Sequence, residues 1–207
     1  LEGPDAVTTW TLDGADTGIV DTSGANQAFA GIENIQGGTA ADTFNLSGGA
    51  SYTLVSGGDG NDVFNVMAAT SGALSGEGDD DTFDIDAALR GSVDGGADSD
   101  TLQGSLINAA VLTGSAADGY AGTEADVSLD FSGINVLTGN GGTLTGDDVA
   151  SAWTIDGASS LYFDNGANGT LSISGFGTYT GGDDTDTFNV TGATSANLSS
   201  GTGAVAD

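Results

Sequence analysis

Apolar and polar residues alternate over short segments of the chain, which is the pattern of half-buried β-strands. The segment Asp42–Leu46 reads DTFNL. Its alternation puts Phe44 and Leu46 on one face, with Asp42 at the edge of that face, and puts the intervening polar residues on the other. No apolar pattern keeps the period of about 3.6 residues that a helix needs, and glycine occurs throughout. The pattern therefore predicts an all-β protein.

The same segment recurs at a nearly constant interval. Successive copies begin at Asp42, Asp62, Asp81 and Asp100, and a further copy begins at Asp186. A second apolar series has the same spacing, at Leu54, Leu74 and Val93. Each unit of about 20 residues therefore reads as a strand, a turn, a second strand and a Gly/Asp turn.

A unit with two short strands cannot enclose a core alone, but stacked copies can. Strands of successive units would pair in parallel about 4.8 Å apart, so that equivalent residues form ladders. We therefore expect a parallel β-solenoid, or β-helix, with rungs of about 20 residues. The expected internal ladders are Phe44, Phe64, Phe83 and Leu102, with Leu46, Val66 and Ile85 beside them.

A longer repeat is superimposed on these units. The segment around Trp10 matches the segment around Trp153, and Leu12 matches Ile155 at the same offset. We therefore predict one continuous domain over 1–207, with a full super-repeat in 1–143 and a partial second one in 144–207.

Two features of this repeat leave alternatives open. Same-face alternation with apolar neighbours predicts that Trp10 and Trp153 are core residues; an exposed aromatic platform for sugar is the alternative. The repeat pattern is weakest from 104 to 142, where we expect a loop or an enlarged rung and assign no strands.

Composition limits the chemistry that the chain can perform. Its 207 residues include 30 acidic side chains, 26 of them Asp, and a single basic one, Arg90, so the formal net charge is −29. There is no His and no Cys, which excludes histidine-based triads, cysteine zinc sites and disulfides. A charge of this sign repels nucleic acid and anionic membranes, and no apolar run approaches a membrane span. We expect no enzyme, no nucleic-acid partner and no membrane insertion.

One segment carries a known binding motif. Residues 57–65 read GGDGNDVFN and fit the nonapeptide G-G-x-G-x-D-x-U-x at every defined position, with Phe64 as the apolar residue U. Here the chain resembles the hemolysin-type (RTX) calcium-binding repeats of secreted bacterial proteins. The resemblance implies a right-handed solenoid with Ca²⁺ held between the turns of successive rungs. Glycine permits positive-φ turns, and aspartate supplies the hard oxygen ligands that Ca²⁺ prefers.

The other copies match this motif in part, and they recur once per unit of about 20 residues instead of every nine. The resemblance therefore implies at most one row of calcium sites along one edge. Its candidate ligands are Asp42, Asp59, Asp62, Asp79, Asp81, Asp98, Asp100, Asp183 and Asp186. Stacked carboxylates about 4.8 Å apart repel by roughly 3.5 kcal/mol per pair at an effective dielectric constant of about 20, which calls for cations or donated hydrogen bonds. The alternative is that Asp and Asn cap the turns without a specific ion.

More loosely, the whole chain resembles the β-strand repeats of giant bacterial surface adhesins, including filamentous-haemagglutinin-like proteins. We therefore expect a non-catalytic structural segment of a long extracellular adhesin or fibre on the bacterial cell surface, with its secretion signal outside this chain. Its partners would be neighbouring repeats or other copies placed end to end. The alternatives are the subunit of a self-assembling filament, or a module that binds surface carbohydrate through residues 104–142 or its aromatic side chains.

Overall fold

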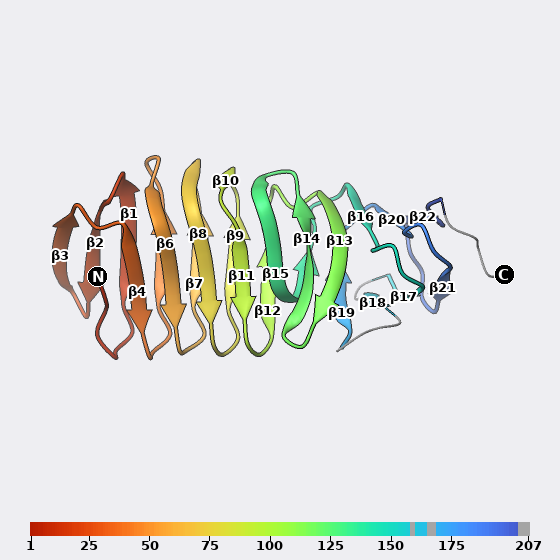
Figure 1. The fold of residues 1–207 in the computed structure, drawn as a ribbon, viewed down its shortest axis with the longest axis horizontal. Coiled ribbons are helices and arrows are strands. Elements are labelled where there is room, and N and C mark those ends of the chain that lie inside the picture. Colours follow the sequence, from red (N-terminus) through yellow and green to blue (C-terminus); the bar gives the residue numbers. More distant parts are fainter. Residues whose placement is uncertain (158–159, 165–168, 203–207) are drawn as a thin grey trace.

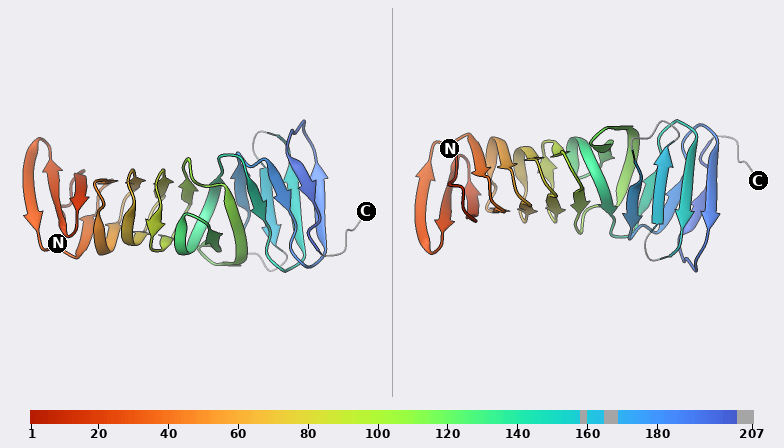
Figure 2. Two further views of the ribbon diagram at one scale, coloured as in Figure 1. Left: turned by 90° about the horizontal axis from the view of Figure 1, so that it is seen from above. Right: turned by 90° about the horizontal axis from the view of Figure 1, so that it is seen from below.

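The computed structural model describes residues 1–157, 160–164 and 169–202, and these contain 22 β-strands and no helix. The strands lie side by side along the long axis of an elongated molecule, with β3 (Ala25–Ala30) near one end and β22 (Asn197–Ser199) near the other (Figure 1). Figure 2 shows the same linear arrangement from two further sides. The prediction of an all-β protein is confirmed. In the described part of the chain, nothing qualifies as a helix that could span a membrane.

One ladder of short parallel strands holds the repeated segments. Phe44 pairs with Phe64, Phe64 with Phe83, and Phe83 with Leu102. This is the register that the aspartate spacing predicts. Trp10 extends the ladder, since it pairs with Phe44. The strands of this ladder are β1 (Thr9–Gly14), β5 (Thr43–Leu46), β7 (Val63–Val66), β9 (Thr82–Ile85) and β12 (Asp100–Gln103).

A second parallel ladder contains the other strand of each unit. In it Val55 pairs with Leu74, and Leu74 pairs with Val93. The prediction that Leu54 belongs to this series is wrong, because Val55 is the buried residue and Leu54 is only partly covered. The strands are β4 (Asn34–Gly38), β6 (Ser51–Gly58), β8 (Thr70–Glu77), β10 (Leu89–Arg90) and β11 (Val93–Gly96).

A register shift within β6 explains this error. Ser51 pairs with Ser71, but beyond the shift Leu54 pairs with Ala73 and no longer with Leu74. The pairing interval is therefore one residue shorter after the shift than before it. A constant spacing in the sequence does not mark partners across such a point.

In the described chain, antiparallel pairs are added to the parallel ladders at three places. They form the successions β1–β2–β3, β13–β14–β15 and β17–β18–β19. The second succession lies within 104–142, so the expectation of a plain loop there is wrong and the region is an enlargement that carries strands. Buried Glu124 fixes this enlargement, because its carboxylate accepts the N–H groups of Asn108, Ala109 and Asp126 at 2.7–3.1 Å. The added strands are β2 (Thr17–Thr22), β3 (Ala25–Ala30), β13 (Ala109–Ala116), β14 (Gly119–Glu124), β15 (Val127–Thr138), β18 (Ser160–Asp164) and β19 (Leu171–Ser174).

Parallel pairing continues through β15, which pairs in parallel with β12 and with β19. Trp153 pairs with Phe188 as Trp10 pairs with Phe44, so the longer sequence repeat has a counterpart in the strand register. β13, β16, β20 and β22 form a further parallel ladder. The remaining strands are β16 (Thr143–Thr145), β17 (Ser151–Ile155), β20 (Thr178–Thr180), β21 (Asp186–Val190) and β22 (Asn197–Ser199).

Stacked aromatic rings form the centre of the core. The ring centroids are 5.8 Å apart between Trp10 and Phe44, 4.8 Å between Phe44 and Phe64, and 4.7 Å between Phe64 and Phe83. Their planes lie within 13° of parallel. Trp153 stacks on Phe188 in the same way at 5.2 Å. Both tryptophans are fully buried, which confirms them as core residues and rules out the exposed aromatic platform.

Candidate functional site

Four aspartates of the repeated segments lie inside the molecule, and we call them the inner row. They share the inward face with the apolar residues two positions further along, and each is at most 1 % exposed. The sequence pattern predicted them at the edge of that face, whereas the structure encloses them completely. The inner row consists of Asp42, Asp62, Asp81 and Asp100.

The inner row is a chain of hydrogen bonds that joins successive units. The N–H of Asp42 donates to Oδ1 of Asp62 at 2.6 Å, and the N–H of Asp62 donates to Oδ1 of Asp81 at 2.7 Å. The N–H of Asp81 donates in turn to Oδ1 of Asp100 at 2.8 Å. At the first end, the N–H and the hydroxyl of Thr8 both donate to Asp42 Oδ1 at 2.6 Å. Each carboxylate therefore stabilises the turn of the neighbouring unit.

The second super-repeat contains the same hydrogen bond at the end of its aspartate row. The hydroxyl of Ser151 donates to Oδ1 of buried Asp186, as Thr8 does to Asp42. Ser151 corresponds to Thr8 at the offset that relates Trp153 to Trp10. Trp153 Nε1 donates to the Ser151 hydroxyl at 2.9 Å and holds it in place.

A glycine five positions before each of these aspartates makes room for the carboxylate. A Cβ atom at Gly57 would lie 2.0 Å from Oδ2 of Asp62, and one at Gly76 would lie 2.0 Å from Oδ2 of Asp81. These two glycines do not have positive φ angles, so close packing and not backbone conformation explains them. Sequence reasoning missed this role, although the constant Gly-x-x-x-x-Asp spacing is its signal.

The second carboxylate oxygen of the inner row is buried and unpaired within the described chain. Burial therefore disfavours the charged form, and it raises the pKa from 3.8 to about 7 for Asp62, about 8 for Asp81 and about 7 for Asp100. Neighbouring negative charges raise the pKa of each of them further, while the donated backbone N–H lowers it. Protons and backbone donors thus offset much of the repulsion that the sequence analysis attributed to a bare carboxylate row.

The other candidate ligands lie on the outside of the same turns, and we call them the outer row. Asp59, Asp79, Asp98 and Asp183 are all exposed. Asp79 and Asp98 have positive φ angles of 69° and 76°, at the place where Gly60 has 100°. Oδ2 of Asp79 accepts the N–H of Gly60 at 2.9 Å. The structure therefore separates these eight predicted ligands into two rows, and nowhere in the described chain do three acidic side chains converge on a possible metal position.

Asp183 and Asp186 occupy the equivalent two places in the second super-repeat. Asp183 is exposed, and its N–H donates to Oδ1 of Asp148 at 3.1 Å. Asp186 is buried, with Oδ2 unpaired within the described chain and 2.0 Å from a Cβ placed on Gly181. The division into an inner and an outer aspartate is thus a property of the repeat and not of one segment.

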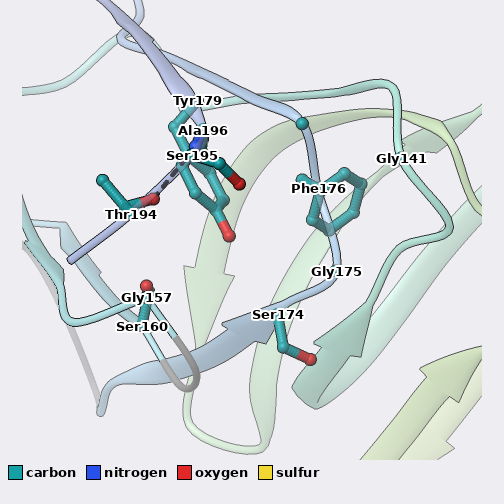
Figure 3. Close-up of a pocket in the computed structure, with 11 residues that line it drawn as sticks. Gly141, Gly157, Ser160, Ser174, Gly175, Phe176, Tyr179, Thr194, Ser195 and Ala196 are labelled. Atoms are coloured by element: carbon teal, nitrogen blue, oxygen red, sulfur yellow. Dashed lines mark hydrogen bonds between the residues drawn. The ribbon is translucent and has the colours of Figure 1, made fainter. Parts of the chain in front are cut away.

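A cleft of about 340 Å³ beside β20 and β22 is lined by uncharged residues (Figure 3). Phe176 and Tyr179 line it together with several small and hydroxyl-bearing residues, and none of its lining residues is acidic. The Ser174 hydroxyl lies 3.2 Å from that of Thr138, and the Thr194 hydroxyl accepts the N–H of Ala196 at 3.0 Å. Since these hydroxyls already have partners, they do not call for a ligand in the cleft.

No protein-family model, curated protein or solved structure matches this chain.

The raised pKa values of the inner row predict that the protein becomes less stable as the pH rises from acidic values through neutral. A group with a raised folded-state pKa stabilises the fold fully below its unfolded value of 3.8, and this contribution is lost as the pH rises through 7–8. The melting temperature should therefore fall between pH 5.5 and pH 9. In Asp81→Asn the fall should be smaller, because Asn keeps the Oδ1 acceptor and cannot ionise.

Asp118→Asn is the matched control, since Asp118 is exposed and the variant makes the same change in charge. In this variant the melting temperature should fall with pH as steeply as it does in the parent protein. Thermal melts of the three proteins in buffers of equal ionic strength measure the effect. Equal slopes for Asp81→Asn and the parent would show that the buried carboxylate does not take up a proton on folding.

The close contact at Gly57 predicts that Gly57→Ala is strongly destabilising. The added Cβ overlaps Asp62 Oδ2, so either the carboxylate or the strand must move, at a cost of about 1–3 kcal/mol in the free energy of unfolding. Gly78→Ala is the control, because a Cβ there meets only Asp59 Oδ1 at 3.7 Å and no positive φ is required. Urea denaturation of both variants tests this, and equal losses of stability would contradict the account.

Proposed function

We propose that this chain is a non-catalytic structural segment of a long extracellular bacterial adhesin or fibre, folded as a right-handed parallel β-solenoid. The observation that carries the proposal is the coincidence of three rows along one axis. The backbone ladders, the aromatic stack and the inner row all join the units that begin at Asp42, Asp62 and Asp81. A protein built in this way lengthens by adding units and needs no closed core.

The chemistry of the surface supports the same function. The formal net charge is −29 and the only basic side chain, Arg90, is exposed. High charge of one sign keeps a protein soluble, and the absence of cysteine means that thiol–disulfide exchange cannot alter the protein. Both properties suit a scaffold outside the cell.

Calcium binding remains part of the proposal, on the strength of the RTX resemblance. The inner row fits a cation poorly, because Oδ1 of each carboxylate is occupied by an N–H group and Oδ2 packs against glycine. The outer row fits better, since its exposed carboxylates supply oxygen ligands on the turns. We therefore place any calcium effect at Asp59, Asp79 and Asp98.

The stalk function predicts a monomeric rod in solution that grows with the number of repeats. Small-angle scattering of the chain and of a tandem dimer of it should give a constant cross-section and about twice the length. Electron microscopy over a range of concentrations and a glycan array complete the experiment. Fibres that form with rising concentration would replace the stalk by a self-assembling filament, and specific glycan binding would replace it by an adhesive module.

The calcium part predicts that millimolar Ca²⁺ raises the melting temperature more than millimolar Mg²⁺ does, because a flexible multi-oxygen site suits the larger ion. The triple variant with Asp59, Asp79 and Asp98 changed to Asn should lose this difference. Asp118→Asn should retain it. Circular dichroism melts in EDTA and then in each ion provide the measurement, and identical melts in all three conditions would refute calcium binding while leaving the structural function standing.

A further inference from the structure

A second acidic feature is a cleft of about 510 Å³ beside the turn that holds Asp183, whose N–H bonds to Asp148 in the lining of the cleft. It is formed by β13, by the segment that follows β16 and by the end of β18. Its lining includes the carboxylate residues Asp147, Asp148 and Asp164 together with Val111 and Val149. This volume is in the range of clefts that hold small organic ligands.

Asp164 is the group in this cleft that calls for a ligand. The residue lines the cleft, is 2 % exposed, and its Oδ1 has no hydrogen-bond partner in the described chain. A buried carboxylate oxygen without a donor costs free energy that a bound donor would recover. None of the cleft's lining residues is basic, so the chain itself supplies no cation there.

Two tyrosines contact these residues, one through the Asp147 carboxylate and one through the Asp164 backbone. Tyr162 donates its hydroxyl hydrogen to Asp147 Oδ1, and its oxygen accepts the N–H of Asp147 at 3.2 Å. Tyr120 donates to the carbonyl of Gly169 at 3.0 Å, and its oxygen accepts the N–H of Asp164 at 3.3 Å. Neither tyrosine therefore donates its hydroxyl hydrogen to the Asp164 carboxylate. Burial raises the pKa of Asp147, and the negative charge of Asp164 raises it further, so the two carboxylates lie close enough to repel each other.

The cleft is particular to the second super-repeat. At the offset that relates Trp153 to Trp10, Asp147 corresponds to Pro4. Tyr162 pairs with Trp153 across the antiparallel strands, and the residue that pairs with Trp10 in the same way is Val20. The first super-repeat therefore lacks a counterpart of the Asp147 carboxylate and of the tyrosine that orients it. A group needed only to build the repeat would be expected in both copies.

The walls favour an organic cation over a metal ion. Val111 and Val149 are 40 % and 43 % exposed, so apolar surface borders the carboxylates. A hard metal ion requires about six or more oxygen ligands, whereas this cleft offers few carboxylates, one of them already bonded to Tyr162. We propose that the cleft of Asp147 and Asp164 binds the ammonium group of a small alkylamine, with its alkyl chain against Val111 and Val149.

The test is a titration of the isotopically labelled protein with n-butylammonium, followed by amide chemical shifts at about 150 mM salt, where diffuse attraction is screened. Saturable shifts should occur at Val111, Gly146, Val149 and Asp164. In Asp164→Asn the apparent dissociation constant should rise about tenfold or more, because a charge-assisted hydrogen bond is lost. Asp118→Asn should bind as the parent does, and n-butanol, which lacks the charge, should not bind.

Three outcomes would overturn the proposal. Shifts spread over all the Asp-rich turns would show diffuse counter-ion attraction and no site. Displacement of the amine by Ca²⁺, with larger shifts from Ca²⁺ alone, would make the cleft a metal site. Absence of saturable shifts in the parent protein would show that the cleft takes no alkylamine, and this result does not depend on the folding of any variant.

Discussion

The structure depends on a contact that repeats along its axis: an aspartate carboxylate is enclosed between the backbone N–H of one unit and the α-carbon of a glycine. The N–H donates to Oδ1, and the glycine leaves space for Oδ2. This contact explains the distance between Gly57 and Asp62 in the sequence and the position of the following Phe64 in the core. Because every carboxylate also caps the turn of its neighbour, the stability of one unit depends on the presence of the next. The parallel ladders and the aromatic stack follow the same repeat.

Much of this arrangement could be predicted from the sequence. Period-two alternation identified the inward side chains, and the spacing of the aspartates that open each unit predicted the correct register for the phenylalanine ladder. For the second ladder the sequence predicted Leu54 where the structure has Val55. A register shift within β6 changes the number of residues between paired positions, and spacing in the sequence cannot detect it. The strands of 104–142 were missed because strands were predicted from the recurrence of the 20-residue unit. Antiparallel pairing within this region does not require such a repeat.

The acidic residues show what the sequence leaves open. For a row of stacked aspartates it offered two ways of offsetting the repulsion, cations or donated hydrogen bonds. The structure buries Asp62 and Asp81, gives each an N–H donor, and raises the pKa of both into the neutral range. The exposed partner of each turn, such as Asp79, is the residue left for solvent or ions. One motif thus contains two aspartates with different environments, and only three-dimensional packing distinguishes their roles.

The enclosed carboxylate row is the central claim of this account, and carbon-detected NMR titration of the aspartate carboxyl groups tests it most directly. If the inner row is buried and hydrogen-bonded as described, the carboxyl carbons of Asp62 and Asp100 should titrate near pH 7 and that of Asp81 near pH 8. Titration of all three in the acidic range of exposed aspartates, around pH 4, would contradict the enclosed row and the interlocking of units that follows from it.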